Sequence, residues 1–414
     1  MQAKRNILII VQNLPVPFDR RVWQEATSLR RHGFGVAVIC PKTGEYTASY
    51  ERLEDVDIYR YALIYEAADR GSSVSGYLVE FGYCWLATLW LALKAYIHRP
   101  FHAIHACNPP DTYFALALLF RPLGVKFVFD HHDLCPELYL AKGHNRTGAL
   151  YRALALLERM TLRSAHAVIA VNESHRAIAL GRGGVADGKV TVVRSGPRCG
   201  WADVASPSPE LKRGRKYMVL YLGTMGEQDG VDHLLRAIQS YRTIAPNDTL
   251  FAFVGGGPNL PRMKSFAEQM GLGPVVHFAG RIPDEQLCAY LSTADVCVDP
   301  DPSTEFNNLC TMNKILEYMA FGRPIVAFDL MEHRRSAESA AVYISGNDDP
   351  ALGRAIRELL LAVERRETMS QFARTRFREV LAWEHSEQQL ITAYRNLLEA
   401  GLPTSTVNAS PQES

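Results

Sequence analysis

The sequence TMNKILEYMAFGRPIVAF, residues 311–328, decides the fold because a helix pattern and a buried strand follow each other directly. Asn313, Lys314 and Glu317 open the helical part, a Gly-Arg-Pro sequence ends it, and an apolar strand follows. The first turn of a helix that docks on a parallel strand presents free N–H groups and a partial positive charge. Lys314 opposes this dipole, which is easier to explain if an anion binds there. An ordinary αβ unit with a surface lysine would give the same pattern.

The succession of apolar strand and helix pattern recurs along the whole chain. Strands are expected in the first half at residues 7–11, 35–40, 103–105, 126–130 and 167–171, with a first helix at 21–32. Strands are expected in the second half at residues 217–223, 250–254, 275–278, 296–299 and 324–328, with a helix at 231–240. Apolar strands that alternate with helices indicate parallel sheets covered on both faces. We therefore expect an α/β protein with two doubly wound domains in series, joined by a charged, proline-containing linker at 199–216.

Length and charge limit the possible classes of protein. The chain has 414 residues, too many for one compact core, with 47% hydrophobic and 21% charged residues and a net charge of +1. Residues 1–195 carry 23 Lys and Arg against 17 Asp and Glu, so the first half is basic and the second acidic. No Arg-rich run with interleaved aromatics is present, so nucleic acid is not an expected partner. An anionic membrane surface suits the basic half at least as well.

The eight cysteines form no C-x-x-C pair and sit mostly in apolar runs. This distribution indicates a reducing compartment and argues against structural zinc. The chain begins with Lys4 and Arg5 directly before an apolar strand rather than with a signal peptide. We therefore expect a cytoplasmic location.

One segment, FGYCWLATLWLAL at residues 81–93, is strongly apolar. It is too short to span a bilayer, which needs about 20 apolar residues. Trp85, Trp90 and the adjacent Lys94 suit an interfacial helix that lies on a membrane. A buried core helix of the first domain is the other interpretation, and the sequence does not decide between them.

Polar residues gather where expected strands end, which is where ligands bind in such folds. His131, His132 and Asp133 follow the strand at 126–130. The His-Asp pair could orient a sugar hydroxyl. Alternatively, the two histidines could bind a metal, although adjacent histidines rarely point at one ion, or His132 could simply bond a backbone carbonyl.

Two further strand ends carry weaker signals. Gly256 lies in a run of three glycines after residues 250–254, where the backbone can approach a ligand closely, but no G-x-G-x-x-G fingerprint is present. Asp299-Pro300-Asp301 could form a metal clamp. Because proline is a turn former, we interpret it as a turn.

These motifs, in this order, resemble glycosyltransferase family 4. The resemblance covers nearly the whole chain and depends on PVPFDRRVWQEA at 15–26, DHHDL at 130–134, RSGP at 194–197, GTMG at 223–226, the segment through Glu317, and WEHS at 383–386. It implies the GT-B architecture of two facing Rossmann-like domains, here residues 1–198 for the acceptor and 199–385 for the nucleotide sugar. A helix at 386–402 would cross back onto the first domain, ahead of a disordered tail at 403–414. Members of the family transfer a sugar from a nucleotide diphosphate donor with retention of configuration.

The resemblance also implies roles for single residues. Glu317 matches a glutamate that binds the donor ribose, but Leu309 stands where the family usually has a second glutamate. Thr224 and Asp229 stand where an arginine and a lysine often bind the diphosphate. Lys314 and the backbone N–H groups of residues 223–226 are the available substitutes, which indicates a variant active site.

We therefore expect His132, Asp133 and Lys314 to be catalytic. His132 would orient the transferred sugar and Lys314 would stabilise the leaving diphosphate. No metal ion or other cofactor is expected, and the nucleotide diphosphate sugar, with UDP as the expected nucleotide, acts as a co-substrate. The expected donor-binding residues are Glu317, Asn313, Thr311, Gly223, Thr224, Gly256 and Arg20, although Arg20 could instead solvate the start of its helix.

The expected partners are the nucleotide sugar, a lipid-linked or saccharide acceptor, and the inner face of the cell membrane. The resemblance implies a role in surface polysaccharide synthesis. Two alternatives stay open: a nucleotide-sugar 2-epimerase of the same architecture, which needs no acceptor, and a non-catalytic relative, which the absent cations and Leu309 would suit.

Overall fold

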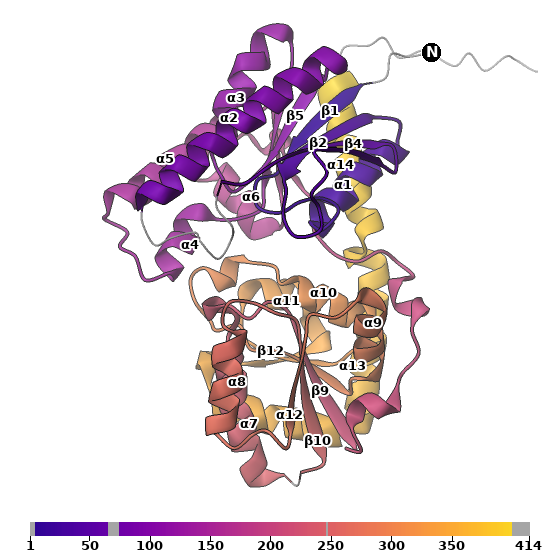
Figure 1. The fold of residues 1–414 in the computed structure, drawn as a ribbon. Coiled ribbons are helices and arrows are strands. Elements are labelled where there is room, and N and C mark those ends of the chain that lie inside the picture. The colour runs from indigo at the N-terminus through magenta and orange to yellow at the C-terminus, as the bar shows by residue number, and fades with distance from the viewer. Residues whose placement is uncertain (1–4, 65–73, 246, 400–414) are drawn as a thin grey trace, which may run out of the picture.

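The computed structural model describes residues 5–64, 74–245 and 247–399, and it contains two α/β domains (Figure 1). The first sheet has eight strands in the order β3-β4-β2-β1-β5-β6-β7-β8. All neighbouring strands in it are parallel except the antiparallel pair β3 and β4. Its strands are β1 Asn6–Ile10, β2 Gly35–Pro41, β3 Tyr50–Leu53, β4 Val56–Tyr61, β5 Ala103–Cys107, β6 Lys126–His131, β7 Ala167–Ala170 and β8 Val190–Val192. The helices of this domain are α1 Arg20–Arg31, α2 Val74–His98, α3 Tyr113–Phe120, α4 Cys135–Ala141, α5 Ala149–Ser164 and α6 Glu173–Leu180.

The second sheet has six parallel strands in the order β11-β10-β9-β12-β13-β14. They are β9 Tyr217–Leu222, β10 Thr249–Val254, β11 Val276–Gly280, β12 Val296–Asp299, β13 Ile325–Phe328 and β14 Ala341–Ile344. The helices are α7 Val231–Ile244, α8 Leu260–Gln269, α9 Asp284–Thr293, α10 Asn313–Ala320, α11 Met331–Ala337, α12 Asp349–Leu361 and α13 Val363–Arg376. Two doubly wound domains of the GT-B type are thus confirmed.

Each sheet is buried on both faces, as near-continuous apolar strands require. Ile7, Leu8, Ile9 and Ile10 of β1 are all fully buried, and alternate residues contribute to two different core clusters. The predicted strand positions agree with the structure to within a few residues. β3, β4, β8 and β14 were not predicted, and residues 199–216 contain two short helical turns, Trp201–Val204 and Pro209–Lys212, instead of an irregular linker.

The last described helix, α14 Trp383–Glu399, returns to the first domain (Figure 1). Trp383 is fully buried in a core cluster with residues of β1 and α1, and its Nε1 donates to Ser28 Oγ at 3.0 Å. The Tyr394 hydroxyl lies 2.7 Å from His105 Nδ1. The helix therefore ties the end of the second domain to the first. The tail expected at 403–414 lies outside the described residues.

The apolar segment at 81–93 lies within the 25-residue helix α2. Its two tryptophans differ: Trp85 packs against the first core, whereas Trp90 is 67% exposed. The core interpretation thus applies to one face of the helix, and the membrane interpretation stays a prediction for the other face. Within the described parts of the chain, the helices lack the combination of length and hydropathy that crossing a membrane requires.

Candidate active site

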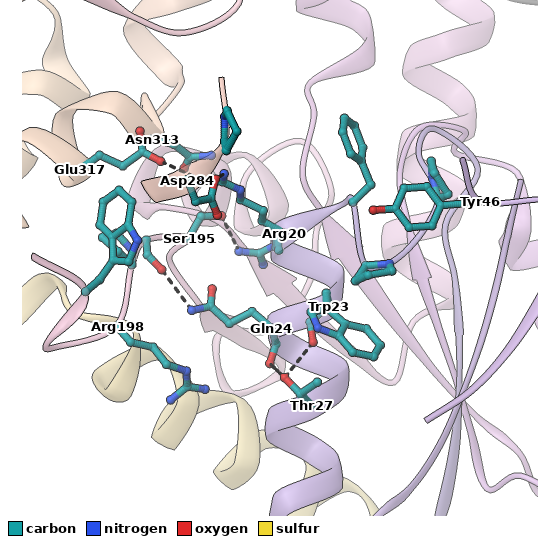
Figure 2. A pocket seen from close by; sticks show the side chains of 18 of the residues that line it. Arg20, Trp23, Gln24, Thr27, Tyr46, Ser195, Arg198, Asp284, Asn313 and Glu317 are labelled. Carbon is teal, nitrogen blue, oxygen red and sulfur yellow. Dashed lines mark hydrogen bonds and ion pairs between the residues drawn. The ribbon is translucent and has the colours of Figure 1, made fainter. Parts of the chain in front are cut away.

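A cleft of about 1100 Å³ separates the two domains, and Figure 2 shows its lining. The first domain contributes the loop after β1, one face of α1, the loop at 43–46 and the crossing at 195–198. The second domain contributes residues 281–284 together with Asn313 and Glu317 of α10. Of the predicted site residues, Arg20, Asn313 and Glu317 line this cleft. The carboxyl ends of parallel strands thus form the site, as doubly wound sheets require.

Helix α1 reaches the cleft because its two faces differ. Asp19 caps the helix by accepting from the Val22 N–H at 3.1 Å, while Val22, Ala26 and Leu29 are buried. The opposite face carries side chains at helical spacing that line the cleft: Arg20, Trp23, Gln24, Thr27 and Arg31. The sequence analysis included only Arg20 from this set, although the spacing of the others was available as a signal.

Glu317 is the acidic group that α10 presents to the cleft. Its side chain is only 18% exposed, and burial raises its pKa to about 7 although the Arg20 guanidinium opposes this shift. Arg20 Nη1 lies 3.7 Å from Glu317 Oε1, and Arg20 also bonds Asp284 (Figure 2). Arg20 of the first domain thus contacts two acidic groups of the second domain. A contact from Arg20 to an anionic substrate stays a prediction.

If Glu317 binds the donor ribose, Glu317→Gln should lower nucleotide affinity by about tenfold or more, because the ribose hydroxyls would lose charge-assisted hydrogen bonds to the carboxylate. A carboxyl group with a raised pKa takes up a proton as the pH falls through that pKa. Affinity for UDP should therefore weaken as the pH is lowered from about 8 to about 6. Above the pKa of Glu317, which is about 7, the affinity should become independent of the ionisation of Glu317.

Calorimetric titration of UDP at several pH values tests both statements. The phosphates of UDP also titrate in this pH range. The Glu317→Gln variant measures how much of the pH dependence of affinity is due to the phosphates alone. An equal pH slope in both proteins would remove Glu317 from the nucleotide site.

Lys314 does not line the cleft. Its ammonium group is buried, with Nζ 2.6 Å from Asp301 Oδ1 and 3.1 Å from Asp299 Oδ1. His333 Nε2 lies 3.2 Å from Asp299 Oδ2. Two carboxylates already compensate the charge of Lys314 in the free protein, and its expected role in stabilising the leaving diphosphate stays a prediction. We call Lys314, Asp299, Asp301 and His333 the lysine cluster.

The interpretation of residues 299–301 as a turn agrees with the structure but leaves out the buried charges of the two aspartates. The turn exists, because the Asp301 N–H donates to Asp299 Oδ1 at 3.2 Å, but both side chains are buried. Burial would lower the pKa of Lys314, yet the two carboxylates hold it well above its usual value. Burial and the charge of Asp299 raise the pKa of Asp301, whereas Lys314 and His333 outweigh burial and depress the pKa of Asp299.

The glycine turns of the second domain lie beside this cluster. A Cβ at Gly255 would come within 1.9 Å of the Gly223 carbonyl oxygen, so the turns after β9 and β10 pack with no space for a side chain. Gly223 N–H donates to Val254 O, Met225 N–H to Gly256 O, and Gly226 N–H to Asp229 Oδ2. Among the described residues only the Thr224 N–H of this turn is left without a partner. The expected amide cradle at 223–226 is therefore mostly closed by internal bonds, and Gly223, Thr224 and Gly256 do not line the cleft.

Thr311 joins the domains instead of lining the cleft. Its Oγ1 accepts from Asn172 Nδ2 of the first domain at 3.1 Å and donates to Glu332 Oε2 at 3.2 Å. Glu332 is fully buried and also accepts from Ser174 Oγ at 2.6 Å. Glu332 was not predicted from the sequence, and of its partners Ser174 lies 158 residues upstream and Thr311 21 residues upstream.

His132 belongs to a charged network at the end of β6. Its Nε2 lies 2.6 Å from Asp130 Oδ2 and 2.8 Å from Arg21 Nε. Arg21 also contacts Asp130 and Glu25, each at 3.0 Å. Asp130 and Glu25 are fully buried. Asp130 Oδ2 and Arg21 Nε both contact the His132 ring at Nε2. The other ring nitrogen, Nδ1, therefore has no partner among the described residues.

The acids of this network differ in ionisation. Burial opposes ionisation of Asp130, but Arg21 and His132 hold its pKa well below the usual value. Burial raises the pKa of Glu25, and the neighbouring Asp130 adds to this effect while Arg21 opposes it. Asp130 is thus the ionised partner of His132. The sequence contained two signals for this network that the prediction did not use. Asp130 and His132 are two residues apart at the end of β6, with His132 just past it, and Arg21 and Glu25 are four apart on a helix.

Asp133 contributes mainly through its backbone. Its N–H and that of His132 both donate to Asn108 Oδ1, at 3.0 and 2.7 Å, and its carbonyl accepts from Asn108 Nδ2 at 2.7 Å. Burial raises the pKa of the Asp133 carboxyl. These bonds fix the loop that carries His132, and a catalytic role for Asp133 itself stays a prediction.

A metal ion on the pair His131 and His132 does not fit the geometry. His131 Nε2 faces Glu158 at 3.4 Å, whereas His132 faces Asp130. Ligand-like groups do converge at Glu25, Asp130 and His132, and also at His105, Cys107 and Asp130. In the first set, the Arg21 guanidinium already lies 3.0 Å from both carboxylates and supplies the positive charge.

Turnover should therefore persist in excess EDTA. Asp299 and Asp301, the other pair that could hold Mg²⁺ or Mn²⁺, both contact Lys314 Nζ through Oδ1, so an ammonium group already supplies the positive charge that a metal ion would bring there. Activity measured after chelation, with and without added Mn²⁺, checks this. If chelation abolished turnover and Mn²⁺ restored it, a metal ion would have to share the neutralisation of the diphosphate.

Two family profiles match the chain and together cover most of it. The profile described as "Glycosyl transferase 4-like domain" matches residues 19–196, and "Glycosyl transferases group 1" matches residues 216–362. The chain belongs to glycosyltransferase family 4. This is a family of transferase enzymes, and each profile covers the greater part of one domain.

Named relatives share parts of the sequence. One is a GDP-mannose-dependent alpha-(1-6)-phosphatidylinositol monomannoside mannosyltransferase of Mycolicibacterium smegmatis, 37% identical over 21% of this chain and 22% of that protein. Another is a D-inositol 3-phosphate glycosyltransferase of Corynebacterium jeikeium, 24% identical over 45% of each chain. The chain thus spans less than half the length of these curated relatives.

Solved structures match over almost the full length. Sucrose-phosphate synthase of Thermosynechococcus elongatus gives a TM-score of 0.71 at 18% identity, covering 96% of this chain and 100% of that one. HepE of Anabaena in complex with UDP gives 0.70 at 14% identity, covering 95% and 100%. At this identity, the likeness establishes the two-domain fold and nothing finer.

Proposed function

We propose that this protein is a retaining glycosyltransferase. It would move a sugar from a nucleotide diphosphate sugar, with UDP as the nucleotide, to a lipid-linked or saccharide acceptor in surface polysaccharide synthesis. The observation that carries the proposal is the interdomain cleft, in which Glu317 faces a space of about 1100 Å³. Ligand pockets are typically about 300–1,000 Å³. This cleft is slightly larger than that range, which leaves room for both donor and acceptor.

The second domain would hold the donor. The Glu317 carboxylate would accept hydrogen bonds from the ribose hydroxyls. Asn313, the first residue of α10, lines the same cleft. The amide end of α10 therefore lies where a diphosphate can accept hydrogen bonds from backbone N–H groups. Lys314 in the next position would stabilise the leaving diphosphate, although in the free protein its charge is paired with Asp299 and Asp301.

The first domain would hold the acceptor and orient the transferred sugar. Asp130 and Arg21 contact the His132 ring at Nε2. His132 does not line the cleft itself, and its Nδ1 would have to reach a sugar hydroxyl near the anomeric carbon from the end of β6. The leaving phosphate would assist deprotonation of the acceptor as the bond to the anomeric carbon breaks. No metal ion or other cofactor takes part in this proposal. A site at the inner face of the cell membrane would bring the cleft to a lipid-linked acceptor.

The test is product analysis with a panel of UDP- and GDP-sugars and a membrane extract as the source of acceptors. The expected result is free UDP in equal amount to a new glycoside with the donor's anomeric configuration. A converted nucleotide sugar without acceptor would instead indicate a 2-epimerase. Nucleotide binding without any product would favour a non-catalytic relative, and a GDP-sugar donor would correct the nucleotide.

A further inference from the structure

Helix α2 presents an unpartnered apolar stripe to the outside of the first domain. Val79, Leu86, Trp90, Leu93 and Ile97 are exposed, with Trp90 67% and Ile97 84% exposed. Their spacing of seven, four, three and four residues places all five on one side of an α-helix. A stripe of this length is not explained by single exposed apolar residues, which are common.

Packing on the opposite side fixes the orientation of this helix. Cys84, Ala92 and Ala95 are buried in the first core, and the buried Thr88 Oγ1 lies 3.3 Å from the Tyr113 hydroxyl of α3. Trp85 packs against the same core. The stripe therefore stays exposed while the helix is docked.

The apolar surface continues over two more helices. Helices α2, α3 and α5 lie on the same side of the first domain (Figure 1), and α3 contacts both α2 and α5. Among the residues whose exposure the structure describes, 21 large apolar side chains are exposed, and 12 of them lie on these helices or the turn after α3. We call these 12 residues the outer surface: Val79, Phe81, Leu86, Trp90, Leu93, Ile97, Leu118, Leu119, Leu123, Leu150, Leu156 and Met160.

The exposed charged side chains on α2, α3, α5 and the turn after α3 are all positive. The only acidic residues of α2, α3 and α5 are Glu80 and Glu158, and both are buried. The exposed charged side chains on these helices and on the turn after α3 are Lys94, Arg121, Arg152, Arg159 and Arg163. On these described helices, exposed apolar side chains thus occur together with exposed cations only. This combination matches an anionic bilayer, in which apolar side chains enter the acyl region and cations contact the headgroups.

We propose that the outer surface docks on a bilayer that contains anionic lipids, with α2 lying in the plane of the interface. The biological role of this docking rests on the proposed function, because docking would bring the cleft to a lipid-linked acceptor. A second copy of the chain is the competing occupant. The uniform positive charge disfavours it, because two such surfaces would repel each other.

The test is co-sedimentation of the full chain with phosphatidylcholine vesicles that contain or lack phosphatidylglycerol. Binding should require phosphatidylglycerol and weaken with added salt. The double variant Trp90→Gln/Ile97→Gln should bind at least about tenfold less, since both side chains insert when docked. Its thermal midpoint should match the wild type, because both side chains are mostly exposed. The matched control is Ile244→Gln/Leu361→Gln, which removes two exposed apolar side chains of the second domain, 51% and 55% exposed, and should bind as the wild type does.

Failure of the wild type to bind anionic vesicles, or equal binding by the Trp90/Ile97 variant, would overturn the proposal. A wild-type dimer that this variant converts to monomer, without vesicle binding, would also overturn it in favour of a second copy. Turnover of a soluble acceptor is measured in parallel and should not change in the variant. Vesicle binding without turnover of any donor would refute the proposed function and leave the surface proposal standing.

Discussion

Replacing Lys314 with methionine is expected to lower the free energy of unfolding by about 3–5 kcal/mol, because removal of one partner leaves buried charge uncompensated. Asp299 and Asp301 lie 3.1 and 2.6 Å from its Nζ, and both are buried. Chemical denaturation of the purified variant measures this change. A loss below about 1 kcal/mol would mean that water or other groups compensate the two carboxylates.

A second substitution separates stability from catalysis. Lys314→Met combined with Asp301→Asn removes one positive and one negative charge together and leaves Asp299 beside His333. Because burial and Asp299 already raise the pKa of Asp301, the amide is a mild replacement for this side chain. The double variant should therefore regain most of the lost stability.

Turnover of the double variant then reports what the ammonium does for the reaction. If Lys314 stabilises charge on the leaving diphosphate, turnover should stay at least about 100-fold below the wild type, as for loss of one oxyanion donor. Binding of the nucleoside monophosphate should be close to normal. Recovery of turnover together with stability would show that the lysine cluster only supports the turns after β9 and β12.

The fold was largely predictable because its strands are buried on both faces and read as apolar runs. The missed hairpin β3–β4 shows the limit of that signal. Its turn places Glu54 and Asp55 at positive φ, without the glycine or asparagine that usually marks such a turn. Asp55 instead accepts from Arg30 of α1 and from Arg52. Contacts with a distant helix thus replace the local turn chemistry.

The site was predictable where position along an element decided it. Glu317 and Asn313 follow a strand–helix pattern that puts them at the cleft in any doubly wound domain. Lys314 is the next residue to Asn313, but the helix directs it to the buried side, where the β12 end supplies two aspartates. The sequence alone does not reveal whether a charge at the start of a helix faces solvent or a buried acid. The position of Lys314 in the motif was therefore predictable, but its pairing with two buried aspartates was not.

The largest loss of turnover in the first domain is expected at His132. His132→Ala should lower turnover by about 100-fold or more, the usual contribution of a positioned acid, base or hydrogen-bonding group. UDP affinity should change little, because the nucleotide is proposed to bind the second domain. Stability should also fall modestly, since the ring bonds Asp130 and Arg21. Turnover is therefore compared at a temperature where both proteins are fully folded.

Two amide substitutions identify the ring nitrogen that acts on the substrate. The side-chain amide of asparagine can place a polar atom near the position of Nδ1, whereas that of glutamine reaches the position of Nε2. Because Asp130 and Arg21 both contact Nε2, we expect the substrate to meet Nδ1, so His132→Asn should retain more turnover than His132→Gln. His132→Gln should retain more stability, since it preserves the contact with Asp130. The reverse order in turnover would mean that the network opens during the reaction and that Nε2, released from Asp130, is the atom that meets the sugar.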